Sequence, residues 1–383
     1  MPSPTPLSRG PLDDPAPRAG LGWALALRAG DVTPWPAWRD SAAADAPAGA
    51  PGLPFLPGAQ QLELLRRLNV AADGRPLPAG LADRVLRAGS TDRGRGDLPL
   101  AGGGAASPFG PPPVDPTDLP AEDLLKVAAG MIAEDLAARA ARREPRDRRA
   151  RWRAGPAYAG DPWAIEYARH DPRWARPPRR EGPAYVLAGD LGTLAAHAWA
   201  GRALDGAGLD LHGWLRDRIT ADRLPPALDV VAHARAAAER YGVARTVIVT
   251  DPSLLPARDR PAPPPRVGVA AVELTRRVGR PLGLMVAGPE RRRLLAHHLV
   301  PLLAARPGAA ADPLTVPERW LPPLAAQADL MTRALTRAGY PVLGSLEQLV
   351  PTVAPTGSSR EPEPAAALGL ALDLLVDPKD GAW

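Results

Sequence analysis

The chain has 383 residues, of which 45% are hydrophobic and 23% are charged. These proportions are typical of globular proteins and exclude a wholly disordered chain, although 50 Pro and 37 Gly predict long irregular stretches beside the core. There are no cysteines, which excludes disulfides, thiolate metal sites and a cysteine nucleophile.

The net charge of +5 comes almost entirely from arginine, because Lys126 and Lys379 are the only lysines. Together with abundant Ala, Gly and Pro, this bias indicates a GC-rich gene rather than a surface selected for nucleic acid. The most apolar runs, Leu21–Leu27 and Leu368–Val376, are too short to cross a bilayer, and the first residues lack the pattern of a signal peptide. We expect a cytoplasmic protein with no nucleic-acid or membrane partner.

The composition changes along the chain and predicts five segments. They are an irregular Pro/Ala-rich N-terminal segment (1–52), a helical region (53–143), an Arg/Trp/Pro-rich linker (144–183), an α/β domain (184–351), and a flexible link with a C-terminal helix (352–383).

In the first half of the chain, Gly22–Leu27 is a candidate short strand within an otherwise irregular segment. A helix is expected from Pro57, with leucines at helical spacing. A stronger helix follows Asp118, its expected N-cap, and stops at Pro145.

In the second half, Tyr185–Ala188 and Thr246–Thr250 are apolar runs that predict two buried strands. Helices between them make a crossover unit, so the two strands are expected to be parallel. The other predicted elements are helices at 191–204, 211–219, 225–242, 267–279, 288–305, 318–338 and 365–376, an extended piece at 341–343 and a disordered stretch at 351–364. The predicted fold is α/β and helix-dominated, with a small parallel sheet covered by helices and long Pro/Gly-rich irregular segments.

A weak internal repeat joins the two halves. Gly58–Leu68 resembles Gly268–Val278, because in each a Glu lies five residues past the Gly and an Arg pair follows shortly. Residues 124–139 also resemble 294–306, because both begin with Leu-Leu and end with Leu-Ala-Ala-Arg. Chance similarity between amphipathic helices is an equally good explanation, so the region 53–143 is a candidate partial repeat only.

Polar residues follow both predicted strands and form the candidate ligand site. In open α/β sheets ligands bind beyond the carboxyl ends of the strands. Two carboxylates there could divide acid and base roles or hold a divalent cation, but we favour the simpler interpretation that each caps the helix or turn after its strand. The residues of this site are Asp190, Thr193, Thr250, Asp251 and Ser253.

The histidines predict no metal centre, since they have neither metalloprotease spacing nor cysteine partners. His197 lies on an Ala-rich helical face and is expected to be a packed, hydrogen-bonded core residue. We expect no metal and no cofactor, and no catalytic residue can be assigned.

An Arg- and Trp-rich stretch spans residues 142–180. Arg supplies phosphate contacts and Trp can stack on a base, although a solvated linker whose Trp residues pack on the domain is favoured. Trp163 and Trp199 are expected to be buried. The candidate anion-binding residues are Arg148, Arg149, Arg151, Arg153, Arg179 and Arg180.

The order of strand, helices, strand and then Gly268–Arg277, together with the ending Leu330–Leu346, resembles the C-terminal two thirds of actinobacterial sulfotransferase-like proteins. The resemblance covers roughly residues 184–351, and more faintly 53–143 as a second partial copy. It implies an α/β domain, with Trp199 matching a Trp in the helix after the first strand.

The chain departs from that family at the donor site. The resemblance implies a Gly-rich loop with a Lys that holds a phosphoadenosine phosphosulfate donor, yet no such P-loop is present and Gly189-Asp190 stands at its place. The leading hypothesis is therefore a degenerate, non-catalytic accessory or interaction protein, whose partner would be another protein of the same pathway. The alternatives are an active transferase that holds an anionic donor with Arg and helix N-termini, and an anion- or nucleic-acid-binding protein that uses residues 142–180.

Overall fold

The computed structural model of the protein describes most of the chain. The described residues are 15–41, 56–89, 98–103, 110–142, 155–170, 181–206, 208–219, 224–261, 263–308, 310, 314–352 and 363–377. By internal contacts the chain separates into two compact units, Met1–Asp135 with Leu368–Trp383 and Leu136–Ala367. The five segments predicted from composition stay a prediction.

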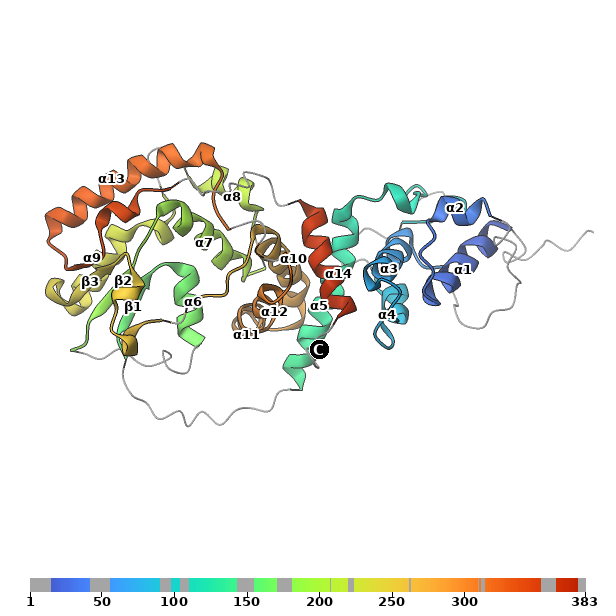
Figure 1. Cartoon of the computed structure of the whole chain (residues 1–383), viewed down its shortest axis with the longest axis horizontal. Coiled ribbons are helices and arrows are strands. Elements are labelled where there is room, and N and C mark those ends of the chain that lie inside the picture. Colours follow the sequence, from blue (N-terminus) through green and yellow to red (C-terminus); the bar gives the residue numbers. More distant parts are fainter. Residues whose placement is uncertain are drawn as a thin grey trace, which may run out of the picture. The chain divides into compact units, whose positions relative to one another are not determined.

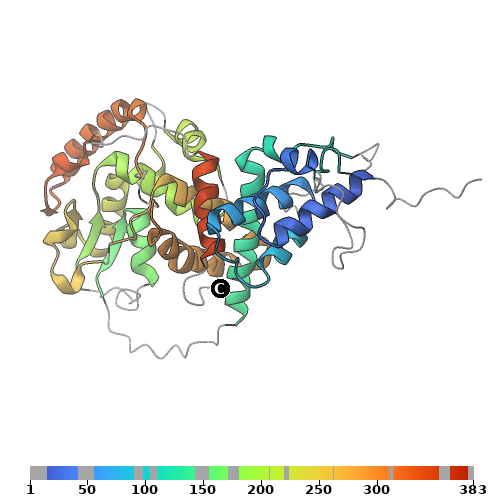
Figure 2. The same ribbon diagram turned by 45° about the vertical axis from the view of Figure 1, so that its right-hand side comes forward.

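The named elements of the first unit, among its described residues, are all helices, and loops and one isolated β-bridge between Leu100 and Val114 join them (Figure 1). The helix α3 packs against α1 and α4, and α1 and α3 lie side by side in Figures 1 and 2. The unit contains α1 (Pro15–Arg28), α2 (Trp35–Arg39), α3 (Ala59–Ala72), α4 (Leu81–Arg87), the 3-10 helix η2 (Pro116–Asp118), most of α5 (Ala121–Ala141) and most of α14 (Pro364–Val376).

Two predictions in this unit are wrong. Gly22–Leu27 is not a strand but part of α1, whose buried residues Trp23, Ala24 and Leu27 have the spacing of a helix face. Asp118 does not cap α5, because it is the last residue of η2. The expected helices from Pro57 and at 365–376 are confirmed as α3 and α14, whereas the predicted stop at Pro145 lies outside the described residues.

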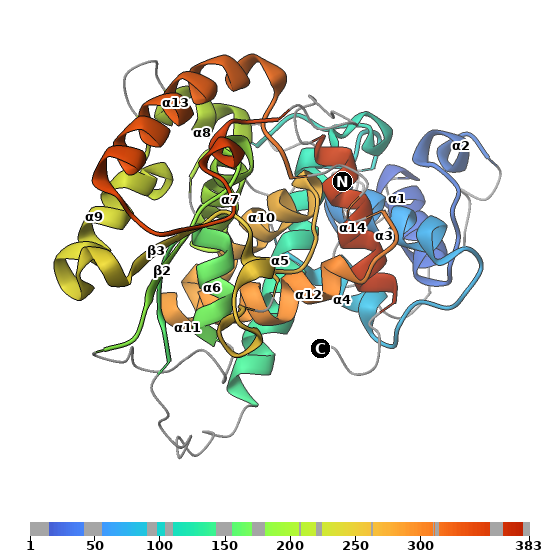
Figure 3. The same cartoon turned by 60° about the vertical axis from the view of Figure 1, so that its left-hand side comes forward.

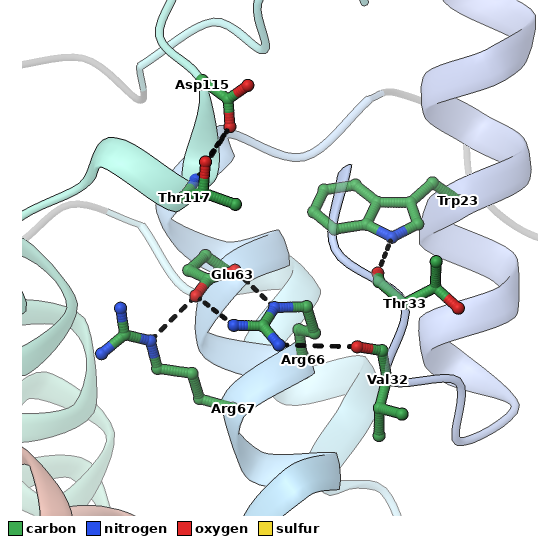
Figure 4. A network of polar contacts seen from close by, with 8 residues as sticks. All are labelled: Trp23, Val32, Thr33, Glu63, Arg66, Arg67, Asp115 and Thr117. Atoms are coloured by element: carbon green, nitrogen blue, oxygen red, sulfur yellow. Dashed lines mark hydrogen bonds and ion pairs between the residues drawn. The ribbon is translucent and has the colours of Figure 1, made fainter. Parts of the chain in front are cut away.

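A buried carboxylate organises the centre of this unit (Figure 4). The Glu63 side chain is 1% exposed and accepts hydrogen bonds from Arg66 Nε and Nη2 and from Arg67 Nε, each at 2.8 Å. Arg66 also donates from Nη1 to the Val32 carbonyl at 3.4 Å, and the Trp23 indole donates to the next carbonyl, that of Thr33, at 2.9 Å. This Glu–Arg–Arg clamp therefore ties α3 to the loop that follows α1.

The second unit carries the same clamp. Glu273 accepts from Arg276 Nε at 2.8 Å, from Arg276 Nη2 at 2.6 Å and from Arg277 Nε at 2.8 Å. Arg276 Nη1 donates to the Gly208 carbonyl at 3.0 Å, and Trp199 donates to the next carbonyl, that of Leu209, at 3.2 Å. Every hydrogen bond of the first clamp thus has a counterpart in the second. The bonds from Arg66 to Val32 and from Trp23 to Thr33 match those from Arg276 to Gly208 and from Trp199 to Leu209.

The second unit combines helices with a small sheet (Figures 1 and 3). Its strands are β1 (Ala157–Gly160), β2 (Ala184–Leu187), β3 (Thr246–Val249) and β4 (Val342–Leu343). Its α-helices are α6 (Pro162–His170), α7 (Leu191–Ala203), α8 (Leu211–Arg218), α9 (Val230–Tyr241), α10 (Val269–Met285), α11 (Gly288–Leu294), α12 (Val300–Ala304) and α13 (Leu321–Ala338). The shorter helical pieces are η3 (Pro226–Leu228), η4 (Val243–Arg245), η5 (Pro252–Leu254), η6 (Ala257–Asp259), the π-helix η7 (Leu295–Leu299), η8 (Glu318–Trp320) and η9 (Leu346–Leu349).

The sheet is parallel and its strand order, β1-β2-β3-β4, follows the chain. The predicted parallel pairing of 185–188 with 246–250 is confirmed, in the register Leu187 opposite Val249. Within the predicted linker 144–183, the described residues include β1 and α6, two elements that the sequence analysis did not predict. The fold is α/β and helix-dominated, as expected, and the predicted stretch 351–364 lies largely outside the described residues.

Helices cover the sheet because both of its faces are apolar. Tyr185, Leu187 and Val249 pack on one face with Ile165 of α6. Val186 alternates to the other face, and α9 packs along β1, β2 and β3. Figure 3 shows α9 on one side of the strands and α6 and α7 on the other.

Candidate functional site

The carboxyl ends of β1, β2 and β3 lie in register, with Gly160, Leu187 and Val249 opposite one another. Each of these strands is followed by an aspartate that accepts hydrogen bonds from the backbone of the next helical segment. The three residues are Asp161, Asp190 and Asp251. The edge of the sheet where a ligand would be expected is thus lined by three capping carboxylates.

Asp161 is placed by a glycine that no other residue could replace without strain. Gly160 has φ +96°, and a Cβ there would lie 2.0 Å from the Leu187 carbonyl oxygen. This close approach lets the Asp161 N–H donate to the same oxygen at 2.9 Å. The Asp161 carboxylate then accepts from the backbone N–H groups of Trp163 and Ala164 at 2.9 and 3.2 Å, and caps α6.

Asp190 is fully engaged by the protein itself. One oxygen caps α7 by accepting from the Thr193 N–H at 2.9 Å. The other oxygen accepts from both the N–H and the hydroxyl of Thr352, each at 2.8 Å. The side chain thereby joins the start of α7 to the segment after η9.

Asp251 caps η5 by accepting from the Ser253 N–H at 2.9 Å. Hydrogen bonds from the Ser253 side chain and backbone lower the pKa of this exposed carboxyl below its ordinary value of 3.8. Thr250 turns toward the end of β4 and donates from its hydroxyl to the Leu343 carbonyl at 3.3 Å. Gly344 makes that approach possible, since a Cβ there would lie 2.2 Å from Thr250 Oγ1.

The structure therefore brings all five predicted residues to one edge of the sheet but gives them structural partners. The capping interpretation of Asp190 and Asp251 is confirmed. A carboxylate that already accepts several hydrogen bonds from protein donors has few lone pairs left for a metal or for acid–base work. In the part of the chain that the structure describes, no three His, Asp or Glu side chains gather as a metal centre would require.

Sequence reasoning missed the partner of His197. The second oxygen of Asp161 lies 2.9 Å from His197 Nδ1, and the two side chains are only 15% and 19% exposed. The prediction that His197 is packed and hydrogen-bonded is confirmed, but composition places Asp161 in a linker. The Gly-Asp pair after a short apolar run was the available signal, identical to the Gly189-Asp190 pair that follows β2.

A cavity of about 280 Å3 lies beside this pair. The wall is mostly apolar, and His197 and Arg266 are its charged or titratable members. The lining residues are Trp163, His197, Pro264, Pro265, Arg266, Val267, Ala310 and Leu314.

The Arg/Trp stretch is described only in part. The candidate anion-binding residues Arg148, Arg149, Arg151, Arg153, Arg179 and Arg180 lie outside the described residues. Trp163 and Trp199 are 2% and 1% exposed, so their predicted burial is confirmed. No helix in the described ranges is long and apolar enough to span a membrane.

Comparison with protein-family models, with curated proteins and with solved structures finds no match to this chain. The sulfotransferase resemblance therefore rests on the sequence pattern alone and stays a hypothesis.

Proposed function

We propose that this protein is a non-catalytic accessory protein, a sulfotransferase-like chain that has lost the site for its donor and acts by binding another protein of the same pathway. The observation that carries the proposal is the carboxylate at each of three neighbouring strand ends, Asp161, Asp190 and Asp251. A donor phosphate binds where backbone N–H groups are open and the potential is positive. Here the N–H groups already donate to carboxylates, whose negative charge would repel a phosphate.

The helix N-termini support the same conclusion. The consecutive helices α6, α7, α8 and α9 each begin at an aspartate whose side chain accepts from the backbone of the first turn, namely Asp161, Asp190, Asp210 and Asp229. A transferase that held an anionic donor on these N-termini would have to displace the caps. The alternative of an active transferase is accordingly disfavoured at this edge of the sheet.

The strand order adds a second argument. Open α/β sheets bind nucleotides in the crevice where the strand order reverses. The order β1-β2-β3-β4 follows the chain and does not reverse among the described strands. The sheet therefore lacks the usual crevice for a nucleotide, independently of the aspartates.

Titration calorimetry with adenosine 3′,5′-bisphosphate, the nucleotide product of sulfuryl transfer, tests the loss of donor binding. We expect no heat of binding at millimolar nucleotide, under conditions in which an active sulfotransferase gives a saturable isotherm. A saturable isotherm from this protein would contradict the proposal.

The accessory role has its own test. Affinity purification of the tagged full chain from its native host, followed by mass spectrometry, should recover a sulfotransferase or another enzyme of the same pathway in stoichiometric amount. Recovery of the chain alone, at a salt concentration that preserves protein complexes, would count against this role.

A further inference from the structure

The cavity beside the Asp161–His197 pair has the features of a ligand site that no part of the proposed function uses. Asp161 holds one ring nitrogen of His197 at 2.9 Å and is itself fixed by the N-terminus of α6. Since a carboxylate can only accept, Nδ1 carries the proton in this contact. In the neutral imidazole, Nε2 is then a hydrogen-bond acceptor on a side chain that lines the cavity.

A second lining residue, Arg266, favours an anion. Arg266 lines the cavity, is exposed, and forms no ion pair with any residue that the structure describes. The segment Pro264–Val267 leads directly into α10, whose N-cap Gly268 provides no side-chain cap. The positive end of a 17-residue helix therefore follows the cavity wall without a carboxylate to neutralise it, in contrast to α6–α9.

The rest of the wall is apolar. Trp163, Pro264, Pro265 and Leu314 are among the residues that line it, and its volume of about 280 Å3 lies just below the usual range of about 300–1,000 Å3 for small-molecule sites. A ligand that complements these lining residues must be small and have an apolar body, an anionic group that pairs with Arg266 and a hydrogen-bond donor for His197 Nε2.

We propose that this cavity binds a small apolar carboxylic acid that carries an N–H donor next to the carboxylate, such as an N-acylated aliphatic amino acid. The carboxylate pairs with Arg266 near the start of α10, the amide N–H donates to His197 Nε2, and the aliphatic group packs against Trp163 and the prolines. Asp161 acts as a positioning residue that holds the tautomer of His197. This inference goes beyond the proposed accessory function and involves no phosphate or sulfate.

Titration calorimetry of the full chain with three matched probes tests the assignment. N-acetylleucine contains all three features, N-acetylleucine amide lacks the carboxylate, and 4-methylpentanoate lacks the amide N–H. We expect N-acetylleucine to bind with one site, and each simplified probe to bind about three- to tenfold more weakly, as the loss of one hydrogen bond or ion pair implies. No saturable binding of N-acetylleucine at 10 mM, a concentration about tenfold above a millimolar dissociation constant, would overturn the proposal.

Variants separate the two polar contacts. Arg266→Gln should lower the affinity for N-acetylleucine and for 4-methylpentanoate about three- to fivefold and leave the affinity for N-acetylleucine amide unchanged. His197→Phe should lower the affinity for N-acetylleucine and N-acetylleucine amide and leave that for 4-methylpentanoate unchanged. Arg235→Gln, at an exposed position on α9, is the matched charge control and should change nothing. Because Arg266 is exposed, its variant is expected to fold, and an affinity for N-acetylleucine that is the same in Arg266→Gln and the parent would refute the site even if His197→Phe does not fold.

Discussion

Single residues set the geometry at the ends of the strands. Gly160 allows β1 to end against the Leu187 carbonyl, so that Asp161 can cap α6 and reach His197. At a positive φ, any residue with a Cβ would clash with the backbone oxygen of β2. The atoms nearest to that Cβ all belong to the backbone of Leu187, so no side chain could rotate away to relieve the clash.

We therefore expect Gly160→Ala to lower the free energy of unfolding by about 3 kcal/mol or more, from the combined cost of left-handed backbone and a backbone clash. Gly242→Ala is the matched control, since Gly242 has φ +89° and a Cβ added there would meet no neighbouring atom within 4 Å, and it should cost only about 1 kcal/mol. Urea unfolding of the three proteins measures the difference. Equal losses in the two variants would show that the close approach at Leu187 does not exist.

Ser253 controls the titration of Asp251. The folded-state pKa is lowered, so ionised Asp251 stabilises the fold above the ordinary value of 3.8, and this contribution is lost as the pH falls through the lower, folded-state pKa. Ser253→Ala should move the pKa of Asp251 upward, toward the ordinary value, because the side-chain hydrogen bond is the largest cause of the shift. A carboxyl-detected NMR titration measures it, with Thr193→Ala, whose backbone bonds to Asp190 instead, as the control. An unchanged pKa of Asp251 in Ser253→Ala would contradict this assignment.

Glu273 is the residue on which the second clamp depends. Its side chain is 4% exposed and accepts from two arginines that are 14% and 23% exposed. Glu273→Gln leaves both guanidinium groups with a neutral partner, and should cost about 2 kcal/mol of unfolding free energy. Glu239→Gln, at an exposed position of α9, is the control and should change stability by less than about 0.5 kcal/mol. Similar unfolding midpoints for the two variants would mean that the clamp does not stabilise the fold.

At the scale of elements, most helices follow from sequence patterns, whereas α1, α2, α4, α6 and β1 do not. Apolar runs bounded by Asp or Gly identified β2, β3 and α7, because most of their side chains are buried. The strand β1 was missed, since Ala157–Gly160 is short and half-buried and lies beside a Pro/Arg-rich stretch. Without β1, Asp161 could not be placed at the sheet, so the contact with His197 could not be foreseen.

The start of α7 carries more than an ordinary helix cap. Asp190→Ala removes the cap and also the two hydrogen bonds from Thr352, and should cost about 2 kcal/mol. Asp229→Ala removes only the bond from Ala232 at the start of α9 and should cost about 1 kcal/mol. Thermal unfolding of the two variants in parallel compares them. A larger loss in Asp229→Ala would contradict the role assigned to Thr352.

At the scale of the whole molecule, the two clamps favour a true duplication over chance similarity. Amphipathic helices can share a Glu and an Arg pair by accident, but accident does not explain matching bonds to the carbonyls of Val32 and Gly208 and matching indole bonds from Trp23 and Trp199. The sequence alone could show the Glu and the arginines. It could not show the carbonyl partners, because a backbone carbonyl leaves no signal in the sequence and the residues that carry these carbonyls, Val32 and Gly208, differ.

At the ends of β1, β2 and β3 the molecule presents carboxylates, whereas the donor site of the proposed sulfotransferase-like ancestor would require free amides and a lysine. The predicted residues of the strand ends were located correctly from the positions of two strands, and their capping role followed from the general preference of Asp for helix N-termini. The third carboxylate and the non-reversing strand order required the structure.

The most direct test of this central claim follows the backbone amides of Ala164, Thr193 and Ser253 in an NMR titration with adenosine 3′,5′-bisphosphate. These are amides that donate to the three strand-end carboxylates. If the carboxylates occupy the phosphate positions, all three resonances stay unchanged up to millimolar nucleotide. Saturable shifts of these amides would show that a phosphate binds at the strand ends, and would contradict the loss of the donor site.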